Sequence, residues 1–179
     1  MSLLKLPIAP LDLLNKIIRP ALKLLPPAMS SVEALVMLVA IALQESALEH
    51  RWQVIDAKRP DKKGPARGLW QFELGSKAKG GGIWGVYQHA SSRYWLAQVC
   101  AARSVAFEPR AIWLALETDD VFACCVARLL LFTDAKRLPS ISETKAAWDL
   151  YRFRTWCPGK PHAGKWPNNH RIAVDVVTR

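Results

Sequence analysis

The sequence predicts a mainly α-helical fold: one buried central helix, a small irregular lobe after it, and a bundle of further helices. Residues 34–43 are apolar without interruption, so a helix formed by them has no polar face and must lie inside the protein. Residues 52–67 are rich in charge, proline and glycine, which is typical of a loop. The rest of the chain carries helix-start signals, little strand signal and no internal repeat.

Residues 1–28 are predicted to form an arm that packs on a domain made of residues 29–179. Five prolines punctuate the arm, and the two short apolar stretches at 11–18 and 21–25 suit half-buried helical turns. Many exposed leucines would promote aggregation, so we expect the arm to cover part of the domain.

The central helix has the clearest start signal in the chain. Ser30 and Glu33 fit the S-x-x-E capping box, in which the two side chains satisfy free backbone N–H groups at a helix start. The apolar stretch follows, and the pattern turns polar abruptly at Gln44-Glu45-Ser46. The helix is therefore expected to run from the interior to a surface at Glu45.

Later segments alternate between loops and helices. Residues 68–72 suit a short strand or turn, and the Gly- and Lys-rich residues 76–85 suit a loop. The helices that we expect after this loop span residues 86–105, 109–116, 119–132, 143–156 and a last stretch through Val177. Their start signals are Pro109, Thr118, Ser140 with Glu143, and Asn168 or Asn169.

Composition narrows the classes of partner. The net charge of +10 favours an anionic partner, such as nucleic acid, a membrane surface or the acidic polymers of a bacterial wall. Eight tryptophans supply flat apolar faces that suit sugar rings as well as a core. The longest apolar run has ten residues, whereas a membrane-spanning helix needs about 20, so no membrane span is expected.

The four cysteines predict buried, reduced thiols. Cys100, Cys124, Cys125 and Cys157 have no disulfide-framework spacing, and no pair has the spacing of a zinc site, so neither metal nor cofactor is expected. The N-terminus also lacks the pattern of a secretory signal peptide.

Glu45 is the candidate for chemistry. A carboxyl group where an apolar helix emerges is partly removed from water, which disfavours its charged form and raises its pKa. A carboxylic acid that stays protonated near neutral pH can donate a proton to a glycosidic oxygen. A glutamate in the last turn that simply faces water is the alternative interpretation.

Two motifs in order resemble a known family. Gln44-Glu45-Ser46, followed by Gly68-Leu69-Trp70-Gln71-Phe72-Glu73, resembles the paired signature of goose-type lysozymes and soluble lytic transglycosylases, with Trp70 in place of a methionine. The resemblance covers residues 30–160. It implies a lysozyme-like α+β fold, cleavage of the glycan strands of peptidoglycan, and Glu45 as the catalytic acid.

Further roles follow from the same resemblance. It assigns sugar contacts to Ser46 and Gln71, with Gly68 and Trp70 in the same motif. The later family motif A-A-Y-N-A-G corresponds to Ala146-Ala147-Trp148-Asp149-Leu150-Tyr151, which departs from it at the Asn and Gly. Trp148 takes the position of the aromatic residue that lines the family's cleft, and Tyr151 lies nearly one helical turn further on.

Two reaction routes remain open, because both use Glu45 as acid. Inverting hydrolysis requires a second carboxylate on the opposite face of the sugar. Glu73 is the candidate, with Asp61 in reserve and Asp56 as a weaker choice. A lytic transglycosylase needs no second acid, because Glu45 then removes a proton from the muramic 6-hydroxyl and a 1,6-anhydro ring closes.

A different class also fits the composition. Basic clusters at residues 51–63 and 152–165, with tryptophans between them, suit a nucleic-acid-binding or virion structural protein, or a wall-binding domain without activity. We expect the glycan strands of peptidoglycan rather than nucleic acid as partner, and a monomer. A wall-cleaving enzyme without a signal peptide implies a phage endolysin that waits in the host cytoplasm for release to the periplasm, or a lysin carried in the virion.

Overall fold

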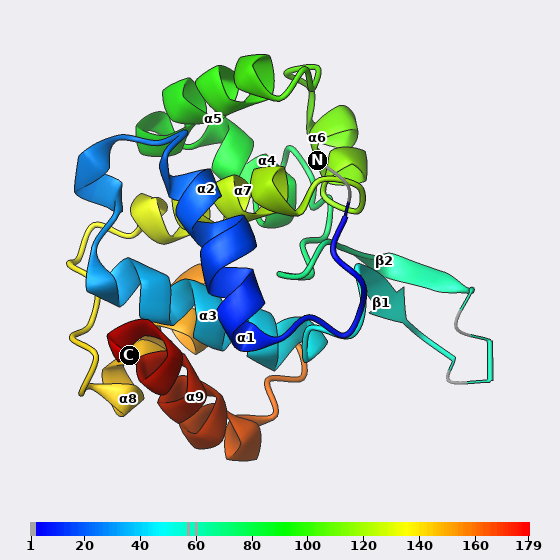
Figure 1. The fold of residues 1–179 in the computed structure, drawn as a ribbon. Coiled ribbons are helices and arrows are strands. Elements are labelled where there is room, and N and C mark those ends of the chain that lie inside the picture. The colour runs from blue at the N-terminus through cyan, green and yellow to red at the C-terminus, as the bar shows by residue number, and fades with distance from the viewer. Residues whose placement is uncertain (1–2, 57, 60) are drawn as a thin grey trace.

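The computed structural model describes residues 3–56, 58–59 and 61–179 and confirms a mainly helical fold (Figure 1). The parts of the predicted arm and loop that fall on residues 1–2, 57 and 60 lie outside this description. The helices are α1 (Pro10–Asp12), α2 (Arg19–Leu22), α3 (Val32–Ser46), α4 (Gly82–Gln88), α5 (Ala90–Ala102), α6 (Pro109–Ala115), α7 (Asp120–Thr133), α8 (Thr144–Asp149) and α9 (Trp166–Thr178). The π-helical turns are η1 (Leu13–Ile18) and η3 (Leu150–Thr155), and the 3₁₀ turns are η2 (Pro27–Met29) and η4 (Ala163–Lys165).

Helix α3 lies at the centre of the fold. Every residue from Val36 to Ala42 is buried, as the continuous apolar run predicts. Its cap is Ser31, whose Oγ accepts the N–H of Ala34 at 3.2 Å. The predicted cap at Ser30 was therefore wrong by one residue, because Ser31 is the residue in extended conformation directly before the first helical turn.

The N-terminal segment contributes to the same hydrophobic core as α3. α1, η1 and α2 follow one another as a nearly continuous helix across α3 and α7 (Figure 1), with Leu13, Leu14, Ile17 and Ile18 buried. In the wide turn η1, the Arg19 N–H donates to the carbonyl of Leu14. The helix thus widens just before Pro20, which has no N–H of its own to donate.

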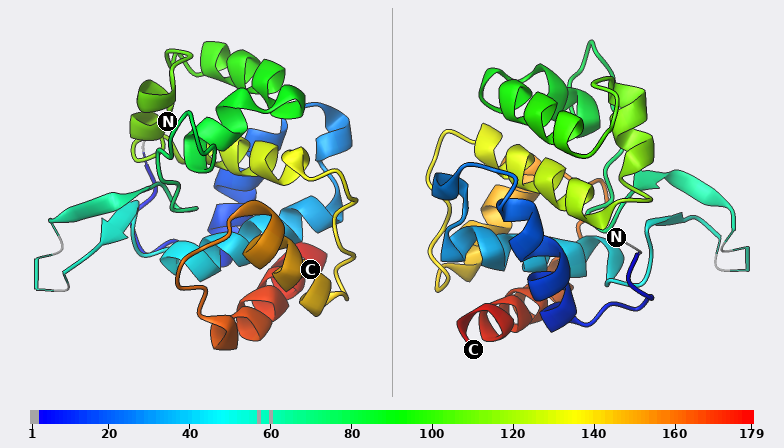
Figure 2. Two further views of the ribbon diagram at one scale, coloured as in Figure 1. Left: turned by 180° about the vertical axis from the view of Figure 1, so that it is seen from behind. Right: turned by 45° about the horizontal axis from the view of Figure 1, so that its top comes forward.

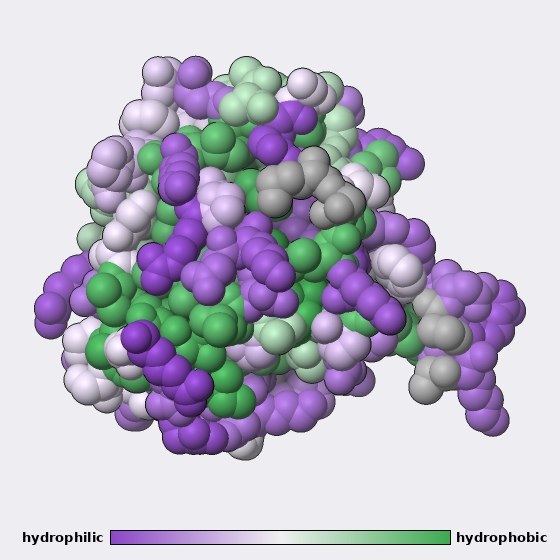
Figure 3. All heavy atoms as spheres, in the orientation of Figure 1, coloured by the Kyte–Doolittle hydropathy of each residue, from purple (hydrophilic) through white to green (hydrophobic). Residues whose placement is uncertain are grey.

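A two-stranded antiparallel hairpin, β1 (Trp52–Val54) and β2 (Lys63–Arg67), replaces much of the predicted loop at 52–67. The pairing shifts register between Trp52 and Val54. The hairpin projects from the helical body (Figures 1 and 2), and its surface is mainly hydrophilic (Figure 3). The sequence did not indicate these strands, because the buried positions of β2 hold only the small residues Gly64 and Ala66 and the exposed positions are charged or proline.

The middle helices follow the predicted segments with three corrections. The loop expected over residues 76–85 is shorter, because α4 already begins at Gly82. The expected helix 86–105 is divided into α4 and α5 at His89, whose extended backbone and ring nitrogen cap α5. Helix α7 is capped by Asp119, whose Oδ1 accepts the Phe122 N–H at 2.9 Å, and not by Thr118. Pro109 begins α6 as expected.

The C-terminal helices surround one face of α3, and α3 packs closely against α9. Glu143 accepts the Ser140 N–H at 2.8 Å, which is half of the predicted capping box before α8. The predicted caps Asn168 and Asn169 were wrong, because α9 already begins at Trp166, with Pro167 in its first turn.

Three of the four free cysteines are buried as predicted, but the prediction is wrong for Cys157, which is exposed. Within the described residues, no helix has the length and apolar character needed to cross a bilayer. No group of three or more His, Cys, Asp or Glu residues in that same part of the chain is placed to hold a metal ion.

Candidate active site

A cavity of about 650 Å³ opens at the C-terminal end of α3. Its walls come mainly from the end of α3, the base of the hairpin with the turn after it, η3, and the segment that joins η3 to α9, with single residues from α4 and α7. The lining residues are Gln44, Glu45, Gln53, Ala66, Gln71, Phe72, Glu73, Gly82, Leu130, Tyr151, Thr155, Trp156, Cys157, Pro158, Gly159, Lys160 and His162. The two motifs, distant in sequence, therefore contribute to one cavity.

Glu45 lies on the cavity wall in the last turn of α3, partly buried. Burial raises the pKa of its carboxyl group to about 7, while a hydrogen bond from Tyr151 acts in the opposite direction. The Tyr151 hydroxyl donates this bond to Glu45 Oε1 at 2.8 Å. The side chain does not form an ion pair with any described cation, so this carboxyl can hold a proton near neutral pH.

Tyr151 reaches Glu45 because the chain widens into the π-helical turn η3 directly after α8. Its ring is buried and stacks on Trp166 at 5.1 Å between centroids, with an interplanar angle of 10°. Burial and the neighbouring Glu45 raise the pKa of its phenol, so it remains a hydrogen-bond donor over the accessible pH range. Single π-helical turns often occur at functional sites.

Ser46 completes the helix end and does not face the cavity. Its hydroxyl donates to the Ala42 carbonyl at 3.0 Å and accepts the Leu48 N–H at 3.2 Å, and the side chain is buried. Ala47 and Leu48 both have positive φ, which ends the helix sharply. The predicted sugar contact of Ser46 is therefore wrong, and its role is to fix where α3 stops.

Trp70 is also in the core and not on the cavity wall. Its side chain is fully buried, and its indole N–H donates to the carbonyl of Leu38 at 3.0 Å, in the middle of α3. The predicted sugar contact of Trp70 is wrong for this reason. The indole instead anchors the second motif to the helix that carries Glu45.

The remaining residues of the second motif form a tight turn beside the cavity. Gly68 is buried, with φ of 75°, and a Cβ there would lie 3.0 Å from the Leu116 carbonyl oxygen. The backbone conformation and the close packing therefore require glycine here, and contact with a ligand does not explain it. Gln71 does line the cavity, and its side-chain amide donates to the Gly68 carbonyl at 2.8 Å. The predicted sugar contact of Gln71 remains a prediction.

Trp148, the expected cleft aromatic, does not line the cavity. It packs behind the site against Tyr151 and Trp166, with ring centroids 5.5 and 5.6 Å away. Tyr151 occupies the wall instead, three residues later, near the start of η3. Trp156, which the sequence motifs missed, also lines the cavity, and its indole N–H donates to the Trp70 carbonyl at 3.0 Å.

Of the candidate second acids, only Glu73 lies on the cavity wall, and it is exposed. Its backbone is held by the Ile83 N–H, which donates to the Glu73 carbonyl at 3.0 Å. Asp61 is exposed and lies 3.6 Å from Arg59, outside the cavity. Asp56 is likewise absent from the wall and accepts the Lys58 N–H in a turn.

Gln44, in the first motif, joins the C-terminal segment to the end of α3. Its side-chain amide donates to the Pro161 carbonyl at 2.7 Å, and its Oε1 accepts from the Asn169 amide at 2.9 Å. These bonds hold residues 157–162 beside Glu45 and bring Lys160 and His162 to the cavity. Sequence reasoning missed this contact, because no pattern pairs residues that lie more than 100 positions apart.

The first basic cluster, at residues 51–63, is smaller than its sequence indicated. Arg51 is buried and makes two hydrogen bonds to the Asp120 carboxylate, at 2.9 and 2.7 Å. Lys63 forms an ion pair with Glu117. Part of the charge that suggested nucleic-acid binding is therefore already neutralised within the protein.

Comparisons with protein-family models, with curated proteins and with solved structures found no match to this chain.

Proposed function

We propose that the protein cleaves the β-1,4 bond between N-acetylmuramic acid and N-acetylglucosamine in peptidoglycan, with Glu45 as general acid. The proposal rests on the Glu45 carboxyl group, which lines the cavity and has a pKa of about 7. This group accepts a hydrogen bond from the Tyr151 hydroxyl. We also propose a lysozyme-like fold, on the basis of the two motifs that meet at this cavity.

The chemistry of the cavity supports this assignment. Protonated Glu45 would donate its proton to the glycosidic oxygen as the bond to the sugar carbon breaks. Gln71 and Gln53 offer amide groups to sugar hydroxyls, and the partly exposed Trp156 offers an aromatic face. The volume of about 650 Å³ is in the range of small-molecule sites, and the net charge of +10 suits an anionic wall polymer.

Removing the Tyr151 hydroxyl tests how Glu45 is tuned. Because the hydrogen bond favours the Glu45 carboxylate, Tyr151→Phe should raise the Glu45 pKa above about 7. The alkaline limb of the pH–rate profile should move to higher pH by up to about 1 unit. Phenylalanine keeps the ring stacked on Trp166, so the measurement isolates the hydroxyl. Tyr94→Phe, at a side chain that is 61% exposed, should leave the profile unchanged.

Glu73→Gln combined with product analysis distinguishes the two routes. If the enzyme is an inverting hydrolase that uses Glu73 to activate water, this variant should lose about 100-fold in rate, and the fragments should carry reducing ends. In a transglycosylase the loss should be less than about threefold, and mass spectrometry should show 1,6-anhydro ends. Loss of rate together with anhydro ends would exclude Glu73 as the base that activates water.

A sacculus digest tests the proposal as a whole. Purified peptidoglycan should be solubilised into muropeptides, with a rate that falls as Glu45 loses its proton above about pH 7. Retention on sacculi without release of fragments would contradict it and support a wall-binding protein. Salt-sensitive retention on DNA, with no release of fragments, would support a nucleic-acid-binding protein.

The biological setting belongs to the same proposal. We infer a bacteriophage origin, with the enzyme acting as an endolysin that passes from the host cytoplasm to the periplasm, or as a lysin of the virion. An enzyme of this kind would be antimicrobial when added to bacteria whose wall is accessible.

A further inference from the structure

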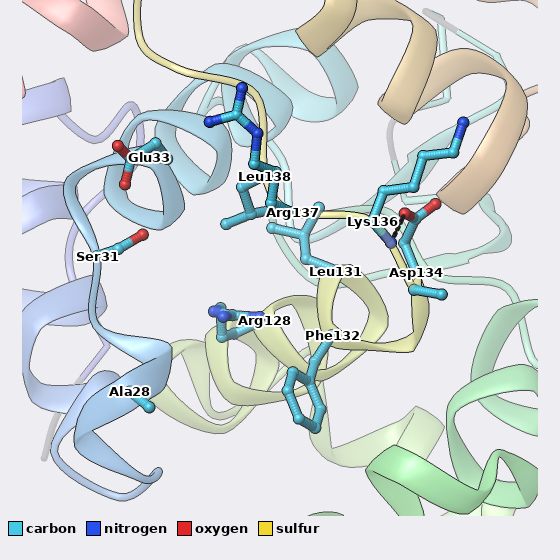
Figure 4. Close-up of a pocket in the computed structure, with 11 residues that line it drawn as sticks. Ala28, Ser31, Glu33, Arg128, Leu131, Phe132, Asp134, Lys136, Arg137 and Leu138 are labelled. Atoms are coloured by element: carbon cyan, nitrogen blue, oxygen red, sulfur yellow. Dashed lines mark hydrogen bonds between the residues drawn. The ribbon is translucent and has the colours of Figure 1, made fainter.

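A second cavity, of about 500 Å³, lies at the opposite end of α3 from Glu45. At about 1.5 Å per residue, the 15-residue helix separates the two ends by about 20 Å, so the two cavities are distinct. The wall comes from η2, the start of α3 with its cap, the end of α7 and the segment that follows α7 (Figure 4). The lining residues are Ala28, Ser31, Glu33, Arg128, Leu131, Phe132, Asp134, Ala135, Lys136, Arg137 and Leu138.

Arg128 is the unusual member of this wall. Only 5% of the residue is exposed, and Figure 4 shows its guanidinium in the middle of the lining residues. Its Nε donates to the Met29 carbonyl at 2.9 Å, but its Nη1 is buried and has no hydrogen-bond partner among the described residues. No described carboxylate forms an ion pair with it. Its guanidinium also lies near the ring of Phe132, 5.9 Å from the centroid.

A buried guanidinium without a counter-charge is costly for the fold. Burial lowers the pKa of Arg128 to about 10, so the group remains charged at neutral pH. Two unmet requirements therefore coincide at one place in this cavity: a charge without a partner and a donor without an acceptor. An anion with oxygen acceptors satisfies both.

The charges around Arg128 favour an anion with more than one negative charge. Lys136 and Arg137 are exposed at the rim. Asp134 is paired with Arg154 at 3.2 Å and does not neutralise them. Glu33 is the other acid on the wall, and the charge of Arg137 lowers its pKa. Arg128 and Lys136 therefore remain without a carboxylate partner among the described residues.

The start of α3 does not supply the site by itself. Ser31 already accepts the Ala34 N–H, and the Glu33 carboxylate is held by its own backbone N–H and by the Ser31 hydroxyl, which lowers its pKa. These contacts use the groups that an anion would otherwise meet at a helix N-terminus. An anion in this cavity would therefore bind through the Arg128 guanidinium and not through the start of α3.

We propose that this cavity binds a phosphate group, with the guanidinium of Arg128 as its principal donor. The planar fork of arginine matches two oxygens of a phosphate, and the excess of positive charge favours a dianion over a carboxylate. Lys136 and Arg137 contribute charge from the rim, and Glu33 opposes binding. The proposal is independent of the function assigned to Glu45.

Titration with inorganic phosphate tests the site in the whole protein. Amide resonances of ¹⁵N-labelled protein should shift at Ser31, Arg128, Phe132 and Arg137, at ionic strength held constant with chloride. Arg128→Met should weaken the apparent affinity about tenfold or more, since a charge-assisted bond of about 1.4 kcal/mol or more is lost. Acetate in place of phosphate should bind much more weakly.

Matched variants give effects of opposite sign. Arg137→Ala should weaken phosphate binding about threefold, and Glu33→Gln should strengthen it by a similar factor, because one removes an attractive and the other a repulsive charge. Arg110→Met, at an exposed position of α6, and Glu45→Gln should leave the affinity unchanged. These variants keep the test valid even if Arg128→Met does not fold.

Three results would overturn the proposal. The first is phosphate-induced shifts that lie outside the cavity. The second is equal affinity for acetate and phosphate, which would indicate a carboxylate site. The third is unchanged phosphate binding in folded Arg128→Met, or in both Arg137→Ala and Glu33→Gln.

Discussion

Replacing Glu45 with glutamine should abolish release of muropeptides from sacculi, with a loss of rate of at least about 100-fold. The amide has the size of the carboxyl group but no proton to donate, and general acid catalysis typically contributes a factor of about 10²–10⁴. Glu49→Gln is the matched control, because it changes an exposed glutamate four residues further along the chain. That variant should retain wild-type activity.

Unfolding of wild type and of the Glu45→Gln variant, measured across pH, shows whether the variant is folded and has lost the Glu45 titration. The Glu45 pKa is raised from 4.5 to about 7 in the folded state, so the folded protein binds this proton more tightly than the unfolded chain. The resulting stabilisation is complete below about pH 4.5 and disappears as the pH rises through 7. Wild type should therefore lose stability over this window relative to the variant. A folded variant that still digests sacculi at near wild-type rate would contradict the assignment of the acid.

Replacing Arg51 with alanine should give a large loss of stability, about 3–5 kcal/mol in the free energy of unfolding. The Arg51 and Asp120 side chains are only 7% and 5% exposed, and Arg51 also donates to the Leu4 carbonyl at 2.7 Å. Removing the arginine leaves the Asp120 carboxylate buried without its counter-charge, which costs more than the pair itself contributes. Urea unfolding, with the midpoint and slope compared, measures the change.

Two variants separate this effect from the general cost of losing an arginine. Arg59→Ala breaks the exposed contact with Asp61 and should cost between about 0 and 1 kcal/mol. The double variant Arg51→Met with Asp120→Leu removes both charges and should recover much of the lost stability. A loss below about 1 kcal/mol in Arg51→Ala would show that the Asp120 carboxylate is stabilised by other groups.

Patterns within one element predicted the positions of the main helices. The uninterrupted apolar run gave a buried α3, and its abrupt polar end placed Glu45 at a surface, where the structure has a cavity. The position of Pro109 and the contact between Ser140 and Glu143 also agree with the local signals. Such features depend on residues within one or two turns, which a sequence displays directly.

The wrong helix caps at Ser30, Thr118 and Asn168 or Asn169 are local errors, whereas the larger errors in the site involve tertiary contacts. Trp70 and Ser46 occupy motif positions, yet the Trp70 indole donates to the Leu38 carbonyl in the core and the Ser46 hydroxyl donates to the Ala42 carbonyl of its own helix. Tyr151, and not the predicted Trp148, lies on the cavity wall, at the start of the π-helical turn η3, which the sequence did not predict. The hydrogen bond from Gln44 to the Pro161 carbonyl and the burial of Arg128 without a partner for its Nη1 both arise from tertiary packing, which local sequence patterns do not show.

The direction of α3 has an electrostatic consequence for the proposed reaction. The peptide dipoles of its 15 residues align, so the end that carries Glu45 bears a partial negative charge. This charge opposes ionisation of the carboxyl group and so reinforces the dominant effect of burial. The same field favours positive charge, which develops on the sugar ring as an oxocarbenium-like transition state forms. The orientation of α3 thus favours protonated Glu45 before the bond breaks, and it favours the positively charged sugar ring in the transition state.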